Sequence, residues 1–178
     1  MLFLNKAVLL AGALPVAVHA LNLNITAITT NGTGSSIFEC WSLSAPLETT
    51  SQPGLVGAAS SFLGDLANMT YTVTPAGFDS GDHNAPYNQW VIPVTGFAIA
   101  TLPDDPAASL YASKDMPGGI MFAADIADLS HAGHGSLFPG YTPTILLQIP
   151  TLGNKIPEHT VLHAGVCTSN DTVGFSTL

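Results

Sequence analysis

Histidine is the residue type in this sequence with the clearest capacity for chemistry, because imidazole binds metals and exchanges protons near neutral pH. After an apolar leader the chain carries five histidines, and each stands near an end of a predicted β-strand: His83, His131, His134, His159 and His163. A single histidine is more often a surface or core residue than a ligand, so the prediction rests on their distribution. Strand ends that are far apart in sequence can meet at one mouth of a small antiparallel β-structure. We therefore expect several of these rings to share a site.

The residues around His83 follow a regular spacing. Gly77 is followed by five residues and His83, then by Ala85 and Gln89, and six further residues lead to Gly96. This spacing resembles the first motif of the cupin family, which runs Gly, five residues, His-x-His, three or four residues, Glu, six residues, Gly. Ala85 stands in place of the second histidine and Gln89 in place of the glutamate.

A second stretch resembles the other cupin motif. It begins at Gly119, passes through Asp125 and an enlarged turn, and ends at His134, which best matches that motif's ligand histidine. The resemblance covers residues 77–149 and implies a small β-barrel or jelly roll. Cupin centres use three histidines and a glutamate, a donor set that suits iron, manganese or nickel.

This chain keeps two of those four ligands, His83 and His134. Alanine cannot coordinate a metal, and an amide oxygen is a weak, uncharged substitute for a carboxylate. His131, Asp125 or Asp128 could complete a set. The pattern favours a pocket that keeps the cupin mouth without a tight metal, so we expect no metal and no other cofactor.

A longer series of segments, HNAPYNQWV, FAADIADLSHAGHG, FPGYTPTILLQIP and VLHAGVC, resembles a group of small secreted fungal cupin-like proteins. That group includes the hetero-Diels–Alderases of tropolone sesquiterpenoid biosynthesis. The resemblance implies dehydration of a benzylic alcohol to a quinone methide and its cycloaddition to a humulene-type alkene. It makes apolar small molecules the expected partners.

The residue inventory is compatible with that chemistry, which needs an apolar cavity, a few hydrogen-bond donors and a general acid. Candidate donors are His83, Gln89 and His134, and Asp125 is a candidate general acid. Candidate walls are Trp90, Phe97, Phe122, Phe138, Tyr141 and Leu147. Taken singly, each of these aromatic residues is more often an ordinary core residue, and Asp125 and Asp128 are equally suited to capping a turn.

Two rival functions come from other classes. One is a metal-dependent cupin oxygenase or isomerase. The other is a non-catalytic secreted protein that binds small molecules or associates with a cell wall. Among other enzyme signatures, the sequence has no Gly-x-Ser-x-Gly, phosphate loop, dinucleotide fingerprint or Cys-x-x-Cys.

The elements that must position these residues are short β-type runs divided by Gly and Pro turns, which is typical of an all-β sandwich or barrel. Predicted strands are residues 70–74, 90–94, 97–102, 120–124, 145–149 and 159–163, after an ordered start at 36–43. Residues 21–36 predict an exposed lead-in strand or loop. Residues 53–68 have helix-like apolar spacing, weakened by Gly57 and Gly64. We expect one cupin-like domain over 21–178 with one or two short helices.

The amino-terminal twenty residues predict a secretory signal peptide, with Lys6, an apolar run and a small-residue cleavage site. Four Asn-x-Thr sequons agree with secretion and glycosylation: Asn24, Asn31, Asn68 and Asn170. Cys40 and Cys167 are the only cysteines, and in an oxidising compartment they predict one disulfide.

Composition excludes some partners. Charged residues make up 8% of the chain, and the net charge is −9 with no arginine. Such a surface cannot neutralise phosphates, so we expect no binding to nucleic acid or to anionic membranes. No second long apolar run follows the leader, so we expect no stable membrane insertion.

Overall fold

The computed structural model describes residues 21–115 and 119–171, and the predicted signal peptide lies outside them. The described chain is built almost wholly of β-strands, which confirms the predicted all-β class. The strands are β1 (Asn22–Thr30), β2 (Ser36–Pro46), β3 (Glu48–Thr49), β4 (Ala59–Ser60), β5 (Thr70–Thr74), β6 (Phe78–His83), β7 (Gln89–Thr95), β8 (Phe97–Leu102), β9 (Asp105–Ser113), β10 (Met121–Ala123), β11 (His134–Phe138), β12 (Thr144–Pro150) and β13 (His159–Ala164). A 3-10 helix, η1 (Leu152–Asn154), is the only helical element among these residues.

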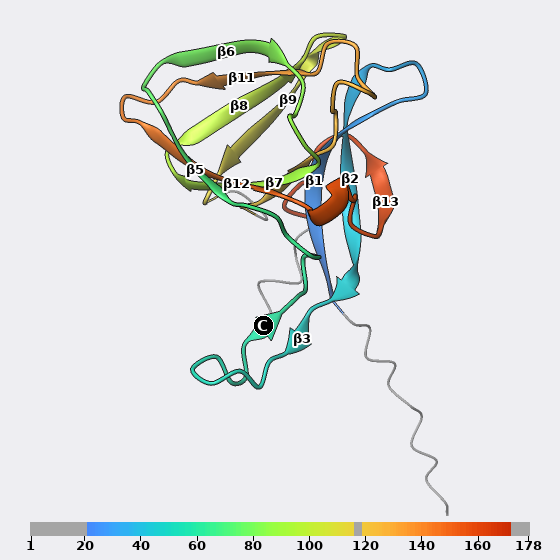
Figure 1. Ribbon diagram of the computed structural model, residues 1–178, viewed down its shortest axis with the longest axis vertical. Coiled ribbons are helices and arrows are strands. Elements are labelled where there is room, and N and C mark those ends of the chain that lie inside the picture. Colours follow the sequence, from blue (N-terminus) through green and yellow to red (C-terminus); the bar gives the residue numbers. More distant parts are fainter. Residues whose placement is uncertain (1–20, 116–118, 172–178) are drawn as a thin grey trace, which may run out of the picture.

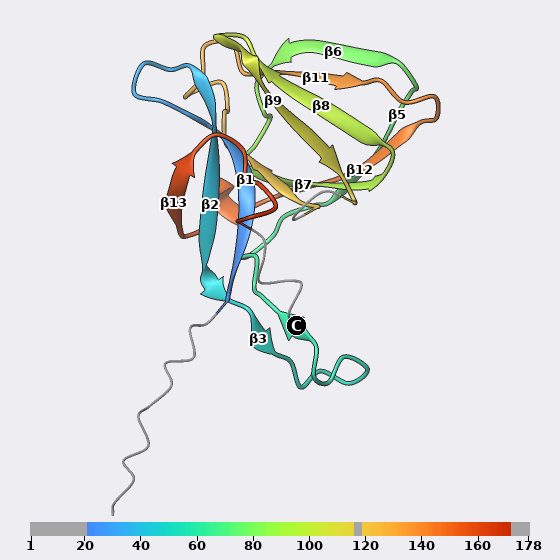
Figure 2. The ribbon, with the colours of Figure 1, turned by 180° about the vertical axis from the view of Figure 1, so that it is seen from behind.

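Two sheets face each other as a β-sandwich of jelly-roll-like character, not as a closed barrel (Figure 1). The larger sheet has seven strands in the order β13-β2-β1-β10-β7-β12-β5, and the smaller has four in the order β6-β11-β8-β9. Figure 2 shows the same two layers from behind, with β8 and β9 in front of the end of the larger sheet that carries β12 and β5. Consecutive strands such as β7 and β8 lie in different sheets, and the chain turns between them at Gly96, where φ is +68°.

Alternation of burial along single strands explains how the sandwich encloses its interior. In β8, Ala98, Ala100 and Leu102 are buried, while Phe97 is exposed and the residues between them are half-buried. This is the period of two that sends successive side chains to opposite faces of a sheet.

Residues 21–36 contain the predicted lead-in strand, β1, but the prediction that it is exposed is wrong. β1 lies inside the larger sheet, antiparallel to β2 and parallel to β10, with Thr26 opposite Met121. Ile25, Ala27 and Ile28 are fully or almost fully buried. Apolar and β-branched residues favour a strand that is packed on both faces of a sheet. Their burial in β1 outweighs the preference of the neighbouring polar residues for solvent.

The helix predicted over residues 53–68 is also wrong, because this segment forms an irregular arm that contains β4. Gly54, Gly57 and Gly64 all have positive φ, between +85° and +96°. Left-handed backbone conformations interrupt a right-handed helix, and glycine adopts them without steric cost. Leu63 instead packs on the larger sheet, where its carbonyl accepts a hydrogen bond from Trp90 Nε1 at 3.1 Å.

Three large aromatic side chains form a core on the face of the larger sheet that is turned away from the smaller sheet. Trp41, Trp90 and Phe122 are at most 1% exposed, and the ring centroids of Trp90 and Phe122 lie 4.9 Å apart. Leu63 from the arm covers them. The larger sheet therefore has two packed faces, one under the arm and one toward the smaller sheet.

The predicted disulfide joins Cys40 of β2 to Cys167. Sequon residues Asn31, Asn68 and Asn170 are exposed. Asn24 is half-buried in β1, and its Nδ2, the atom that a glycan would occupy, donates a hydrogen bond to the Asp171 carbonyl at 2.7 Å. The folded chain thus presents three of the four sequon asparagines to solvent.

Among the described residues, no helix has the length and apolar character needed to cross a membrane.

Candidate active site between the two sheets

A cavity of about 340 Å³ lies between the two sheets. Its walls come from both sheets, with β6, β8, β9 and β11 on one side and β5, β7, β10 and β12 on the other. Its volume is in the range, roughly 300–1,000 Å³, of pockets that bind small organic molecules.

Three polar side chains gather at one end of this cavity. His134 of β11 pairs directly with His83 of β6, and their ring centroids are 4.7 Å apart. Gln89, only 4% exposed, begins β7 and lines the same cavity, as does the buried Ala85. The sandwich therefore brings His83, Ala85, Gln89 and His134, the positions singled out by spacing, to one cavity wall. We call His83, Gln89 and His134 the polar end.

His134 is held from behind by a buried carboxylate. Its Nδ1 lies 2.8 Å from Oδ2 of Asp125, which is 0% exposed, and the same oxygen accepts a hydrogen bond from Ser36 Oγ at 2.9 Å. In the tautomer with the proton on Nδ1, His134 donates this hydrogen bond to Asp125 Oδ2. Asp125 does not itself line the cavity, so it orients His134 and does not meet a ligand.

His83 is oriented by backbone. Its Nδ1 lies 3.0 Å from the carbonyl oxygen of Gly81, which can only accept, and 3.3 Å from Ser80 Oγ, so the shorter contact is a hydrogen bond in the tautomer with the proton on Nδ1. In both histidines Nε2 is therefore the nitrogen left for a ligand. The two rings differ in setting, because His83 is exposed whereas His134 is 7% exposed.

Away from the polar end, the wall grows steadily more apolar along β6 and β11. Ser136 comes next, and its N–H donates to Ser80 Oγ at 3.2 Å. Phe138 then pairs with Phe78. Phe138 clusters with Ala98 of β8 in the same sheet and with Leu146 of β12 on the opposite wall, so these residues form the apolar end.

On β7 and β10 of the larger sheet, apolar side chains follow Gln89 along the cavity wall. Ala123 is opposite Gln89, and Met121 is opposite Val91 one step further along. Three further polar residues line this wall, Gln148 of β12 with Thr72 and Thr74 of β5, and Gln148 Oε1 accepts a hydrogen bond from Thr72 Oγ1 at 2.7 Å.

Gly133 allows the close approach that pairs the two histidine strands. Its φ is +70°, and a Cβ added there would lie 2.0 Å from the carbonyl oxygen of His83. We expect Gly133→Ala to lower the free energy of unfolding by about 2–5 kcal/mol, from the left-handed backbone and the overlap together. Denaturant unfolding followed by circular dichroism measures this loss.

Gly153→Ala is the matched control, because Gly153 has φ of +68° and an added Cβ there would meet nothing within 4 Å. Only the backbone cost of about 1–2 kcal/mol should remain. Equal losses in the two variants would show that contact with His83 is unimportant.

Several residues proposed as walls lie elsewhere. Trp90 and Phe122 belong to the core on the opposite face of the larger sheet, and Leu147 points to that face as well, since its neighbours Leu146 and Gln148 line the cavity. Phe97 and Tyr141 are exposed, and neither lines the cavity. Of the six proposed wall residues, only Phe138 lines it.

The other three histidines do not join the polar end. The His131 ring contacts the loop carbonyl of Thr33 at 2.9 Å, and His159 stacks on Trp41 at 3.7 Å between ring centroids. His163 lies beside Asp171; its bond to the Ala164 carbonyl and its contact with Asp171 raise the pKa of this histidine above its ordinary value. Asp128 is an exposed turn residue, so neither it nor His131 completes a ligand set at the polar end.

In residues 21–115 and 119–171, one group of three metal-ligating side chains comes together: Cys40, His163 and Asp171. Cys40 is bound in the disulfide, so it has no thiolate to offer. At the polar end the donors are two imidazoles and an amide, which does not fit the donor set of a cupin centre.

Strand alternation would have identified the walls that sequence reasoning missed. Starting from Gln89 and stepping by two leads to Val91 and Pro93, and starting from His134 leads to Ser136 and then to Phe138, the one wall residue already predicted; all of these line the cavity. Ala98, Ala100, Ala112 and Ala123 leave the space open, and small residues of this kind carry no sequence signal of their own.

Comparison with known proteins finds no matching family model, no matching curated protein and no matching solved structure.

Proposed function

We propose that this protein is an enzyme that binds an apolar small molecule between its two sheets and transfers protons at the polar end through His134 and His83. The observation that supports this most directly is the pair of imidazoles, each with Nδ1 engaged by an acceptor, at one end of a cavity of about 340 Å³. A positioned acid or base of this kind contributes about 10²–10⁴-fold to a reaction rate.

The reaction we propose is the one implied by the resemblance to the fungal cupin-like group. A benzylic alcohol bearing a ring hydroxyl loses water: His134 Nε2 takes the proton of the ring hydroxyl, the benzylic C–O bond breaks, and His83, protonated on Nε2, donates a proton to the departing hydroxide. The product is a neutral quinone methide, and no oxidant or reductant takes part. Asp125 compensates the positive charge that His134 gains.

Cycloaddition then joins the quinone methide to an alkene by one new C–O bond and one new C–C bond, with no proton transfer. The apolar end can hold the hydrocarbon partner against Phe138, Leu146 and Ala98. The Gln89 amide can donate a hydrogen bond to the quinone-methide oxygen as negative charge develops on it. Orientation of the two reactants supplies much of such an acceleration.

The direct test incubates the purified protein with a quinone-methide precursor and a humulene-type alkene, and follows adduct formation by chromatography. We expect adduct to form faster than in buffer and with one stereochemistry. Adduct formation equal to that in buffer would refute the proposal. Activity that chelation abolishes and added metal restores would favour a metal-dependent oxygenase or isomerase instead.

Filling the apolar end tests whether the cavity is where the reaction occurs. Ala98 is 9% exposed and packs on Phe138 and Leu146, so Ala98→Phe should occupy the space that the hydrocarbon needs. We expect at least a tenfold loss of adduct formation with a folded protein, measured as kcat/KM and by circular dichroism.

Ala107→Phe, at an exposed position of β9, is the control and should retain activity. If Ala98→Phe is folded and fully active, the cavity is not the site of reaction. If His83→Ala, Gln89→Ala and His134→Ala all leave function intact, a non-catalytic binding protein is the better description.

A further inference from the structure

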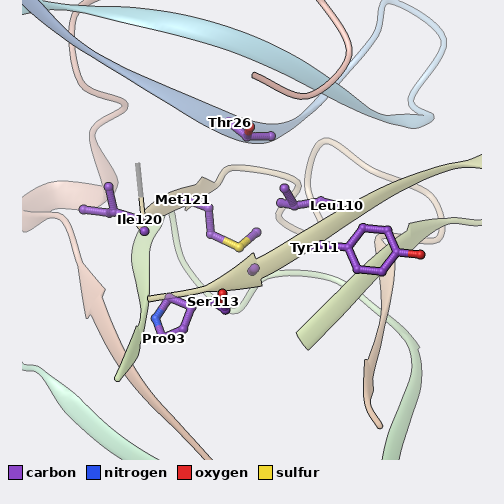
Figure 3. Close-up of a pocket in the computed structure, with 9 residues that line it drawn as sticks. Thr26, Pro93, Leu110, Tyr111, Ser113, Ile120 and Met121 are labelled. Atoms are coloured by element: carbon purple, nitrogen blue, oxygen red, sulfur yellow. The ribbon is translucent and has the colours of Figure 1, made fainter. Parts of the chain in front are cut away.

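A second, smaller space is lined by Met121, which also lines the main cavity. Figure 3 shows the side chains around this space. Its volume is about 20 Å³, roughly that of a single water molecule's probe sphere. The side chains around it come from β1, β7, β9 and β10 and the residue before β10, and include Thr26, Pro93, Leu110, Ser113 and Ile120. Pro93, Ala112 and Met121 line both spaces, so these three side chains form the partition between them.

Met121 is the only member of this partition that can be displaced. The Pro93 side chain is a closed ring and that of Ala112 is a single methyl group, whereas methionine has three rotatable bonds and fills irregular gaps. The backbone of β10 cannot follow, because Met121 is paired with Thr26 on one side and with Val91 on the other. Any widening here must come from the Met121 side chain.

The position of Met121 along the gradient decides which part of a ligand it would meet. Ala123 is opposite Gln89 at the polar end, and Met121 is two residues away, opposite Val91. Met121 also packs with Phe38 and Ala100 in an apolar cluster. It therefore borders the hydrocarbon part of a ligand and not the polar group.

We propose that Met121 sets the length of the hydrocarbon that the cavity accepts, and that the small space behind it is a subsite for longer chains. This inference rests on the proposed function, because it requires the cavity to bind amphipathic molecules with the polar group at the histidines. It assigns a specificity-determining role to a residue that takes no part in proton transfer.

Straight-chain 1-alkanols of six to fourteen carbons provide a series of ligands of increasing hydrocarbon length for this test. Their displacement of the neutral fluorescent probe 1-aminoanthracene gives an affinity for each chain length. The proteins compared are the wild type, Met121→Ala, Met121→Val and the volume-conserving control Met121→Leu. Valine is favoured in β-strands and leaves a smaller cavity than alanine. Met121→Val therefore provides the test if Met121→Ala fails to fold.

In the wild type we expect affinity to rise with chain length to a maximum and then fall. Met121→Ala removes three heavy atoms, so its maximum should move to alcohols about two or three carbons longer, each added carbon strengthening binding about fourfold. Met121→Val should move it by about one carbon, and Met121→Leu should leave it in place. Alcohols shorter than the wild-type maximum should bind all four proteins alike.

If the wild type binds the alcohols but the best chain length is the same in every folded variant, the proposed role of Met121 is overturned. The ligand-binding cavity of the proposed function would then still stand. Failure of every alcohol to displace the probe from the wild type would overturn this inference together with the ligand-binding cavity on which the proposed function rests.

Discussion

Replacing His134 by glutamine should lower adduct formation from the quinone-methide precursor by about 10²–10⁴-fold. The His134 ring lies at the polar end with Nδ1 held by a fully buried carboxylate, so Nε2 is the atom placed to accept a proton. Glutamine has similar polarity but cannot exchange a proton near neutral pH, and the loss should match that of a general base. The measurement is kcat at saturating precursor.

His163→Gln is the matched control, because His163 is exposed and lies beside Asp171, away from the cavity. It should retain wild-type kcat. Equal activity of the His134 and His163 variants would refute proton transfer by His134.

Asp125→Asn should separate the role of Asp125 from that of His134. An asparagine carbonyl can still accept the hydrogen bond from His134 Nδ1 but carries no charge to compensate the protonated ring. As a positioning residue, Asp125 should affect kcat more than KM and change the pH profile of kcat. An unchanged pH profile would indicate that the carboxylate only supports the fold.

The largest effect on stability is expected from removing the disulfide. Cys40 and Cys167 are 127 residues apart, and the bond constrains a loop that includes most of the sandwich. Chain-entropy arguments give about 4–5 kcal/mol for a loop of this length. The double variant Cys40→Ala, Cys167→Ala should lose that much free energy of unfolding in urea titrations.

The wild-type protein unfolded in the presence of a thiol reductant provides the control, and should show the same loss within about 1 kcal/mol. Neither cysteine lines the cavity, so 1-alkanol binding measured well below the unfolding transition should be unchanged. A urea midpoint unaffected by both treatments would mean that packing alone holds the carboxy-terminal segment against β1 and β2.

Local sequence patterns were sufficient for the class of fold and for part of the site. Period-two alternation with Gly and Pro turns predicted an all-β chain, and two cysteines predicted a disulfide that is present. The resemblance of two stretches to the cupin motifs selected His83, Gln89 and His134, which line one cavity. The all-β class and the disulfide could be predicted because strand period, turn chemistry and oxidation depend on near neighbours or on residue type.

Arrangement across the sheets could not be predicted in the same way. Trp90 and Gln89 are adjacent in sequence, yet one is in the core under the arm and the other faces the cavity, and only the packing of the sheets decides which face is which. The parallel pairing of β1 with β10 depends on residues nearly a hundred positions apart. Glycines at positive φ turned a helix-like pattern into the arm.

The sequence by itself therefore determined the all-β class, several of the strands, the disulfide and which residues carry imidazole and carboxyl groups. Tertiary structure alone decided that His83 and His134 meet while His131, His159 and His163 do not, that Asp125 supports His134 from behind, and that a row of alanines leaves space between the sheets. The physical reason is that a strand offers each side chain one of two faces, and which of these encloses a cavity depends on the partner sheet packed against it.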